Sequence, residues 1–399
     1  MEKAVFLTGA RIALDAGRAE PRNLEIAGNR VRALHPPGHT NRNGLVLDLG
    51  GHIVLPGLIN PHDHLEFNLY PRLGRGPYPN AASWARDIYR PDQPPVREHL
   101  AVPKNVRLVW GGLKNLLSGV TTVCHHNPRE LPVFDRGFPV RVLKRFHWAH
   151  SLEFSPDVEQ RFHATPAGCP FILHLGEATD PGGRRELHRL DAMGALDSRT
   201  VLVHAVALGR KELDLVRRRD ASLVWCPSSN LFVLGRTLAG PVLESGIRIA
   251  LGSDSALSAE GDLLDELRVA RSVSGLHGSV LYRMVTEQAA RVLCLPGGAG
   301  RIAAGGPADL VAVPDTRRAP SAALLACVTP RLVTVGGRIR LIACDLARQL
   351  PASALEGFHP LTVEGRETVL VKADVPRLHA RASASLGGAI RLAGRKVLV

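Results

Sequence analysis

Two histidines separated by a single residue, His62 and His64, follow an apolar run at residues 53–59. Because residues two apart in a β-strand point to the same face, both imidazoles would lie on one side of the chain. Two imidazoles at the end of a buried strand can bind one metal ion. Core packing explains such a pair poorly, so the spacing predicts a metal site.

Three more polar residues stand at the ends of later apolar runs, namely His174, His204 and Asp254. Each histidine alone could be a hydrogen-bonded core residue, but both share the strand-end position of the first pair. A buried aspartate is costly unless it is paired or binds a cation. A helix cap is the alternative for Asp254, but the next predicted helix begins too far along the chain. We therefore expect all three residues to join the histidine pair around one ion.

Other residues are candidates for proton transfer and for contact with a substrate. Glu177 follows His174 by three residues, and Gly176 allows a turn that would bring the carboxyl group toward a reacting water. A surface carboxylate is the alternative. The polar residues 228–230 follow another strand and would shape the cavity. The candidates for substrate contact are His125, His126, Trp84 and Trp148.

These side chains need a scaffold that brings strand ends together. Apolar runs alternate with helical patterns through the middle of the chain, which predicts a parallel sheet of the α/β class and, at this length, a (β/α)₈ TIM-like barrel. Residues 68–102 lack a clear period and predict a lid or a wall of the substrate site. An eighth strand is either irregular, near residues 148–152, or missing. The evident strands are 53–59, 120–124, 140–143, 171–175, 201–206, 223–226 and 247–251, and helices are predicted at 106–117, 185–193, 211–219 and 263–273.

The two ends of the chain differ from the middle, because both contain short alternating strands joined by turns. The Gly28-Asn29 step between two such strands is a hairpin signal. We predict that residues 1–51 and 301–399 form the two halves of a small β-sandwich domain, and that residues 52–300 form the hydrolase barrel.

Composition limits the partners that we expect. The net charge is +13, but the arginines are spread thinly without an aromatic-interleaved basic patch, which indicates a solvated surface rather than a nucleic-acid interface. The six cysteines form no Cys-x-x-Cys pair, which is typical of reduced thiols in a cytoplasmic protein. Neither a transmembrane run nor a signal peptide is evident, so no membrane partner is expected. The expected partner is a small-molecule substrate, and a homodimer is the default assembly.

Several segments resemble a known family. The sequence Pro-Gly-Leu-Ile-Asn-Pro-His-Asp-His at residues 56–64 resembles the first-strand signature of the amidohydrolase superfamily. Residues 252–254 resemble its last-strand aspartate, and residues 300–310 resemble its return to the β domain. The His-x-x-Glu at residues 174–177 resembles the branch of cytosine, guanine and adenosylhomocysteine deaminases and triazine chlorohydrolases. The resemblance covers essentially the whole chain, and it is specific for the superfamily but not for a substrate.

The resemblance implies one divalent metal ion, held by the residues that match His62, His64, His174 and Asp254. His204 is implied to contact the water or the substrate. Zinc is the expected ion, although iron or manganese would suit the same nitrogen and oxygen ligands.

The predicted function is hydrolysis of a carbon–nitrogen bond in a cyclic amidine-like or amide substrate. Asp254 would accept a proton from the attacking water, and His204 would hydrogen-bond the developing oxyanion or the nucleophile. Glu177 would protonate the leaving nitrogen or, in a deamination, a ring nitrogen. One alternative is another leaving group, such as a halide. A second is a binuclear amide or ester hydrolase in which a carboxylated Lys144 bridges two metals. A third is a non-catalytic scaffold, which the complete set of ligand types disfavours.

Overall fold

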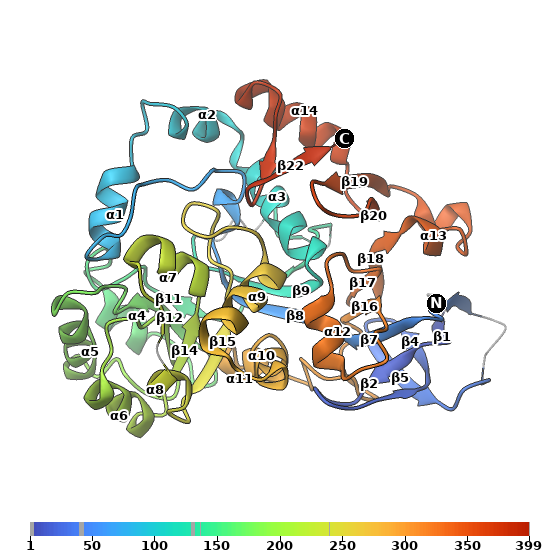
Figure 1. Ribbon diagram of the computed structural model, residues 1–399, viewed down its shortest axis with the longest axis horizontal. Coiled ribbons are helices and arrows are strands. Elements are labelled where there is room, and N and C mark those ends of the chain that lie inside the picture. Colours follow the sequence, from blue (N-terminus) through green and yellow to red (C-terminus); the bar gives the residue numbers. More distant parts are fainter. Residues whose placement is uncertain (1–3, 40–43, 129–131, 136, 239, 399) are drawn as a thin grey trace.

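The computed structural model describes residues 4–39, 44–128, 132–135, 137–238 and 240–398. Its strands fall into two groups: parallel sheets made by the middle of the chain, and mixed sheets made by both chain ends (Figure 1). No helix within these ranges combines the length and the apolar character that crossing a bilayer requires. The predicted α/β class is confirmed.

Two parallel sheets carry the strands that the sequence analysis placed around the site. One has the order β10-β9-β8 and the other the order β11-β12-β13-β14-β15. The backbone N–H groups of Ser253 and Asp254 both donate to the carbonyl oxygen of His62, at 3.2 and 3.1 Å, which joins the chain after β15 to β8. The strands are β8 (Leu58–Asp63), β9 (Val120–His125), β10 (Arg141–Val142), β11 (His147–Trp148), β12 (Phe171–Leu175), β13 (Thr200–His204), β14 (Ser222–Trp225) and β15 (Arg248–Leu251).

The first predicted strand, 53–59, is in fact two strands. The chain breaks at Gly57 between β7 (His52–Pro56) and β8, and β7 pairs with strands of the terminal sheet instead of the parallel one. The prediction of one strand was wrong because an unbroken apolar run does not reveal a change of sheet. Gly57 donates its N–H to Asp309 in the terminal sheet (2.8 Å), and a Cβ atom there would collide with the side chain of Thr121.

Strands from both ends of the chain share one sheet, as predicted. Its order is β21-β22-β19-β20-β18-β17-β16-β7-β2-β3, and a second sheet has the order β5-β4-β1-β6. The predicted hairpin at Gly28-Asn29 joins β4 to β5. The strands are β1 (Val5–Thr8), β2 (Arg11–Ala13), β3 (Ala19–Pro21), β4 (Asn23–Ala27), β5 (Arg30–His35), β6 (Leu45–Asp48), β16 (Leu310–Pro314), β17 (Leu332–Val335), β18 (Arg338–Ala343), β19 (His359–Val363), β20 (Val369–Val371), β21 (Arg391–Leu392) and β22 (Arg395–Leu398).

Helices follow most strands of the parallel sheets, and the four predicted helices are present as α3, α5, α6 and α9. The aperiodic stretch 68–102 contains two short helices, α1 at the left of Figure 1 and α2 at its top, where α2 contacts α14 near the end of the chain. The helices are α1 (Ala81–Ile88), α2 (Val96–Ala101), α3 (Lys104–Leu117), α4 (Val158–His163), α5 (Gly182–Ala192), α6 (Arg210–Arg218), α7 (Pro227–Leu234), α8 (Gly240–Leu243), α9 (Leu263–Ser274), α10 (Gly278–Met284), α11 (Glu287–Val292), α12 (Pro320–Ala326), α13 (Cys344–Ala347) and α14 (Val375–Leu386), with short 3₁₀ turns η1 (Leu65–Phe67) and η2 (Ala352–Leu355).

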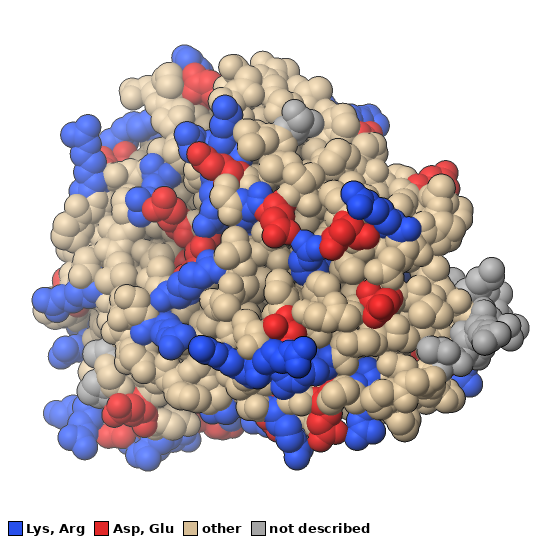
Figure 2. Space-filling model, turned by 45° about the vertical axis from the view of Figure 1, so that its right-hand side comes forward, with Lys and Arg blue, Asp and Glu red and all other residues tan. Residues whose placement is uncertain are grey.

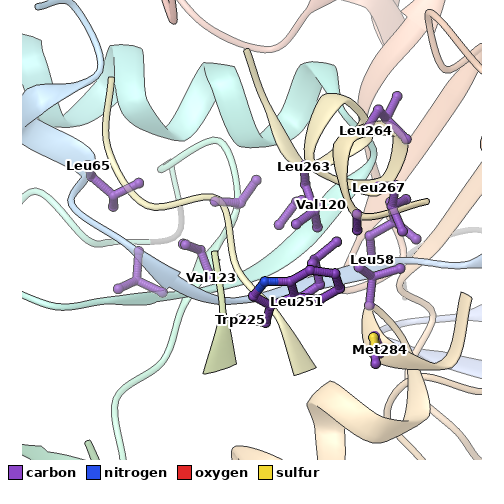
Figure 3. Packing of buried hydrophobic residues seen from close by; sticks show 14 of the residues in the cluster. Leu58, Leu65, Val120, Val123, Trp225, Leu251, Leu263, Leu264, Leu267 and Met284 are labelled. Atoms are coloured by element: carbon purple, nitrogen blue, oxygen red, sulfur yellow. The ribbon is translucent and has the colours of Figure 1, made fainter. Parts of the chain in front are cut away.

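One hydrophobic core joins the two parallel sheets. Leu58 and Val120 from the three-stranded sheet lie in the same buried cluster as Trp225 and Leu251 from the five-stranded sheet, with Leu263 of α9 packed beside them (Figure 3). Burying apolar area contributes about 25 cal/mol per Å² to the stability of the fold. Because residues of both sheets share this cluster, it holds the ends of their strands in fixed positions relative to one another. That rigidity is what a metal site needs.

The basic residues are dispersed over the surface. On the face drawn in Figure 2, Lys and Arg side chains lie among Asp and Glu side chains rather than in one patch. Several arginines are ion-paired, such as Arg219 with Asp191 at 2.8 Å and Arg248 with Asp220 at 2.7 Å. This distribution agrees with the solvated surface expected from the sequence.

Candidate active site

Five of the predicted site residues come together at the ends of the parallel strands. His62 lies in β8 and His64 directly after it, His174 lies in β12, His204 ends β13, and Asp254 follows β15. The donor atoms of His62, His64 and His174 lie within 4.8 Å of one another, and so do those of His62, His204 and Asp254. Since His62 belongs to both groups, the two groups form one cluster.

The distances within the cluster suit a single ion. His62 Nε2 lies 3.2 Å from His174 Nε2 and 3.8 Å from Asp254 Oδ1, and His64 Nε2 lies 3.7 Å from the same oxygen. Two ligands bound at about 2.1 Å to a tetrahedral ion are about 3.4 Å apart. The cluster therefore has the dimensions of a mononuclear centre.

The outer nitrogens of two of these imidazoles donate to oxygen atoms of the protein. His174 Nδ1 donates to the backbone carbonyl of His150, and His204 Nδ1 donates to Asn230 Oδ1, both at 2.8 Å. Because these oxygens only accept, the ring proton must sit on Nδ1, which leaves a lone pair on each Nε2. Such outer contacts are the usual way in which a protein orients metal-binding histidines.

His64 is oriented in the same way by a side chain that the sequence analysis did not single out. Its Nδ1 makes a short hydrogen bond to Asn127 Oδ1, and the Asn127 amide nitrogen donates to Glu66 Oε1 at 2.8 Å. The second contact fixes which way the amide points, so His64 Nδ1 is the donor. His64 therefore also presents a lone pair at Nε2.

His126 determines the tautomer of His62. Its Nε2 donates to the carbonyl oxygen of Ala149 (3.0 Å), so its Nδ1 must accept from His62 Nδ1 (3.1 Å). His62 consequently points an Nε2 lone pair at the Nε2 lone pair of His174, 3.2 Å away. Two facing lone pairs repel unless a cation lies between them. The residues present therefore fit a divalent metal ion.

Burial keeps the cluster in its metal-binding protonation state. Desolvation is the largest cause that lowers the pKa of His62, His174 and His204, so these imidazoles are neutral at pH 7. Burial acts to raise the pKa of Asp254, but His204, His64 and the Ser229 hydroxyl (2.7 Å) outweigh it and the pKa lies below its ordinary value. The cluster thus offers neutral nitrogens and one ionised carboxylate.

The pKa of Glu177 is shifted in the opposite direction from that of Asp254. Burial raises the pKa of its carboxyl group well above the usual range, and the nearby carboxylates of Asp254 and Glu186 raise it further. Its Oε2 lies 3.5 Å from His204 Nε2. This direction favours the carboxylic acid form of Glu177, which is the form that can donate a proton beside the cluster.

A cavity of about 780 Å³ opens directly over the cluster. His64, His174, His204, Asp254 and Glu177 all reach it, as does Trp84, the only one of the four predicted substrate-contact residues that lies in the described lining. This volume is large enough for a small heterocyclic molecule with a substituent.

The other three predicted substrate-contact residues lie outside that lining. His126 is fully buried behind His62, and His125 is buried with its Nδ1 accepting from the backbone N–H of Leu65. The ring of Trp148 packs against that of His126, with centroids 5.2 Å apart. His126 follows β9 as predicted, whereas His125 is the last residue of β9 and Trp148 lies in β11, and none of the three is in the described lining of the cavity.

The sequence analysis missed His150, which does line the cavity. It stands two residues after β11, at the same kind of strand end as the other site residues. The signal was hidden because β11 contains only two residues, His147 and Trp148, at the place where an irregular eighth strand was expected. Lys144, the candidate for a bridging ligand, is exposed and lines a different cavity beside β17.

A buried ion pair between Asp63 and Lys114 lies next to the cluster. Asp63 lies between the two first histidines, and its Oδ2 is 2.9 Å from Lys114 Nζ and 2.8 Å from the donating amide nitrogen of Asn115. Lys114 Nζ also donates to the carbonyl oxygen of Asp254 at 3.2 Å. The pair therefore connects the strand that carries His62 with the loop that carries Asp254.

Replacing Lys114 with methionine is expected to lower the free energy of unfolding by about 3 kcal/mol, because removing one partner of a buried ion pair leaves an uncompensated charge. Urea denaturation followed by circular dichroism measures this change. Lys211→Met, at an exposed position of α6, is the matched control and should leave the midpoint unchanged. Equal midpoints for Lys114→Met and the unmodified protein would contradict the structural role of the pair.

His125 should make stability depend on pH. Burial is the largest cause that lowers its pKa from 6.5 to about 4, so the unfolded chain takes up a proton near pH 6.5 while the folded protein does so only near pH 4. The free energy of unfolding should therefore fall as the pH drops from about 6.5 toward 4, by about 2 kcal/mol at pH 5 for this residue. Denaturation of metal-free protein at pH 7.5 and 5 tests this, and His125→Gln should lose less stability than the unmodified protein. Identical losses would refute it.

Comparisons with known proteins agree with this geometry. The model of the Amidohydrolase family matches residues 167–340. A protein named 5-methylthioadenosine/S-adenosylhomocysteine deaminase 2, from Archaeoglobus fulgidus, is 32% identical in an alignment that covers 75% of this chain and 83% of that relative.

Solved structures share the fold. Atrazine chlorohydrolase from Arthrobacter aurescens, complexed with zinc, superimposes with a TM-score of 0.72 at 20% identity, over 96% of this chain and 100% of that one. An adenosine deaminase from Xanthomonas campestris with bound zinc gives a TM-score of 0.69 at 17% identity, over 96% and 98% of the two chains. The chain belongs to the amidohydrolase family and is a metal-dependent hydrolase of carbon–nitrogen bonds other than peptide bonds.

Proposed function

We propose that the protein is a mononuclear zinc aminohydrolase that releases ammonia from an aminated nitrogen heterocycle of the adenine type. The observation that carries this proposal is the cluster of inward-facing Nε2 lone pairs in the lining of a cavity, with the buried carboxyl group of Glu177 3.5 Å from His204 Nε2. The choice of an adenine-type ring is supported by the name of the Archaeoglobus fulgidus relative, a deaminase of adenine nucleosides.

We further propose that the two parallel sheets form one distorted (β/α)₈ barrel. The order of the strands and the hydrogen bonds from residues 253 and 254 to the carbonyl of His62 support closure on one side. The short strands β10 and β11, which are the outer strands of the two sheets, are where the barrel would be distorted. Active sites of such barrels lie at the carboxyl ends of the strands.

In this proposal His62, His64, His174 and Asp254 hold the ion. Zinc suits a centre that is rich in nitrogen ligands and has one carboxylate, and two structural relatives contain it. When bound, a divalent ion lowers the pKa of a coordinated water to near 7, which supplies a nucleophile at neutral pH. Two of these ligands, His62 and His174, need no deprotonation at that pH, since burial lowers the pKa of both imidazoles.

The remaining chemistry belongs to three side chains. Asp254 accepts a proton from the attacking water while Ser229 (2.7 Å) and Ser258 (3.3 Å) hold its Oδ2. His204 presents a lone pair at Nε2, which favours a hydrogen bond from the attacking water over one to the developing oxyanion. Glu177 donates its proton to the ring nitrogen beside the attacked carbon as the carbon–oxygen bond forms. Asp254 then passes the proton that it took from water to the amino group, the carbon–nitrogen bond breaks and ammonia leaves. The hydroxyl proton on the carbon returns to Glu177 as the carbonyl group forms.

Glu177→Gln is expected to lower kcat by about 10²-fold to 10³-fold, because the amide keeps the shape of the side chain but has no proton to give. Ammonia release from adenosine, 5′-methylthioadenosine, cytosine and melamine by zinc-loaded protein measures this effect. Glu153→Gln, at an exposed carboxylate paired with Arg86, is the matched control. Full activity in Glu177→Gln, or no ammonia from any aminated heterocycle, would refute the proposed function.

A further inference from the structure

One side of the cavity is built from apolar and aromatic side chains of the segment that contains α1 and α2, together with one residue that follows β11. We call this group the apolar lobe. Its members are Phe67, Trp84, Tyr89, Val96, Leu100 and Phe154. The histidine cluster lines the same cavity, so a molecule bound at the cluster would extend its remaining part into the lobe.

Three members of the lobe are large apolar residues that stand open to water. Tyr89, Leu100 and Phe154 are 67%, 42% and 48% exposed, and all three lie at the mouth of the same cavity. Exposed apolar side chains are ordinary when they are scattered, but a contiguous group usually marks a binding surface. An apolar substituent of a ligand would remove this surface from water.

The lobe offers no buried charge to a polar substituent. Within the described lining the carboxylates are Glu177 and Asp254, and both belong to the cluster. The one cation in that lining, Arg86, is 64% exposed and already lies 2.9 Å from the carboxylate of Glu153. Besides Trp84 Nε1, which already donates to Leu73, the polar side-chain group of the lobe is the hydroxyl of Tyr89. A zwitterionic amino-acid group that entered the lobe would therefore lose water without gaining a charged partner there.

The lobe is attached directly to the catalytic strand ends. The N–H of Ala81, at the start of α1, donates to the carbonyl oxygen of Glu177 at 3.0 Å. Asn80 caps the same helix through the N–H of Ser83 (2.9 Å), and Trp84 Nε1 donates to the carbonyl of Leu73 at 2.8 Å. The lobe is therefore preformed at a fixed distance from the proton donor, which is the condition for selecting a substrate by shape.

We infer that the enzyme selects an amino-heterocycle whose ring carries an uncharged apolar substituent, an alkyl or aryl group, and that the apolar lobe binds this substituent. This inference rests on the proposed function, because the amino group must face the histidine cluster for the substituent to reach the lobe. It narrows the substrate class to molecules in which the group that reaches the lobe is neither a sugar nor an amino-acid group.

Two matched substrate pairs test the inference. 9-Benzyladenine and adenosine share the reacting ring and differ in an aryl or a sugar substituent, and 5′-methylthioadenosine and S-adenosylhomocysteine differ in an apolar or a zwitterionic end. We expect kcat/KM for ammonia release to be at least tenfold higher for the apolar member of each pair. Equal values, or a preference for the polar members, would overturn the inference while leaving the proposed function intact.

Variants of lobe residues test whether the preference for apolar substrates arises in the lobe. Phe154→Gln and Leu100→Gln should each lower kcat/KM for 9-benzyladenine by about tenfold and that for adenosine by less than twofold. Val273→Gln, which changes an exposed apolar residue of α9 outside the cavity lining, should change neither value. Equal losses on both substrates in the lobe variants would overturn the assignment.

If none of these molecules releases ammonia, the proposed function fails, and calorimetric binding of 9-benzyladenine and adenosine still decides the inference. Tighter binding of 9-benzyladenine that weakens in Phe154→Gln would support the apolar lobe. Equal binding of the two would overturn it.

Discussion

Replacing Asp254 with asparagine is expected to lower kcat for ammonia release by about 10³-fold while the protein keeps its metal ion. The carboxylate lies 3.7 to 3.8 Å from two of the metal-binding imidazoles and is held by the Ser229 hydroxyl, so it is placed both to bind the ion and to accept a proton from water. An amide retains the hydrogen bond but cannot accept that proton. General-base catalysis contributes about 10²-fold to 10⁴-fold.

Single-turnover kinetics measures the rate of ammonia release in this variant, and metal analysis of the same samples measures how much metal it retains. Asp220→Asn, which alters a surface carboxylate paired with Arg248, is the control and should be fully active. If Asp254→Asn turned over at the normal rate with its metal bound, Asp254 would not be the base.

His174→Ala is expected to reduce the bound metal from one equivalent to less than a tenth, and turnover should fall in proportion. His174 faces His62 at 3.2 Å, and its Nδ1 is fixed by the carbonyl of His150, so its Nε2 presents a lone pair to the cluster and is placed to coordinate the ion. Removing one of a few protein ligands lowers the affinity of such a centre strongly, because the others cannot move inward to replace it.

His150→Ala is the matched control, since its backbone carbonyl and not its ring holds His174. We expect this variant to keep one equivalent of metal in plasma mass spectrometry after extensive dialysis. A full equivalent in His174→Ala would show that the ion binds elsewhere.

The sequence was sufficient to predict the cluster because its residues stand at the ends of uninterrupted apolar strands. His174 and His204 each close a run of buried residues, and the carboxyl ends of parallel strands meet at one edge of the sheet. The same rule would have found His150 if β11 were longer than two residues. The pattern of polar residues at strand ends therefore indicates which positions of the sequence contribute to the site.

Side-chain direction could not be predicted in the same way. His126 follows β9 as the other residues follow their strands, yet it points behind His62, since the pairing of β8 with β9 shifts register between Asn60 and Asp63. His204 and Asp254 have φ values of 74° and 50°, a left-handed backbone that periodicity does not foresee and that costs about 1–3 kcal/mol per residue. Such local irregularities aim the donor atoms at the cluster.

The division of the chain at residues 51 and 300 and the homodimer stay predictions. The ten-stranded sheet explains why the predicted boundary at residue 51 is hard to see in the sequence. Its strand β7 ends at Pro56 and β8 begins at Leu58, so the apolar run 53–59 supplies one strand to each sheet. Hydrophobicity is equal on both sides of Gly57, and only the backbone geometry separates them.

Anomalous diffraction at the zinc absorption edge, from crystals of the zinc-loaded protein, tests the cluster most directly. We expect a single peak bonded to Nε2 of His62, His64 and His174 and to a carboxylate oxygen of Asp254. A peak elsewhere with these side chains unliganded, or two peaks of equal height within the cluster, would contradict a mononuclear centre at the strand ends.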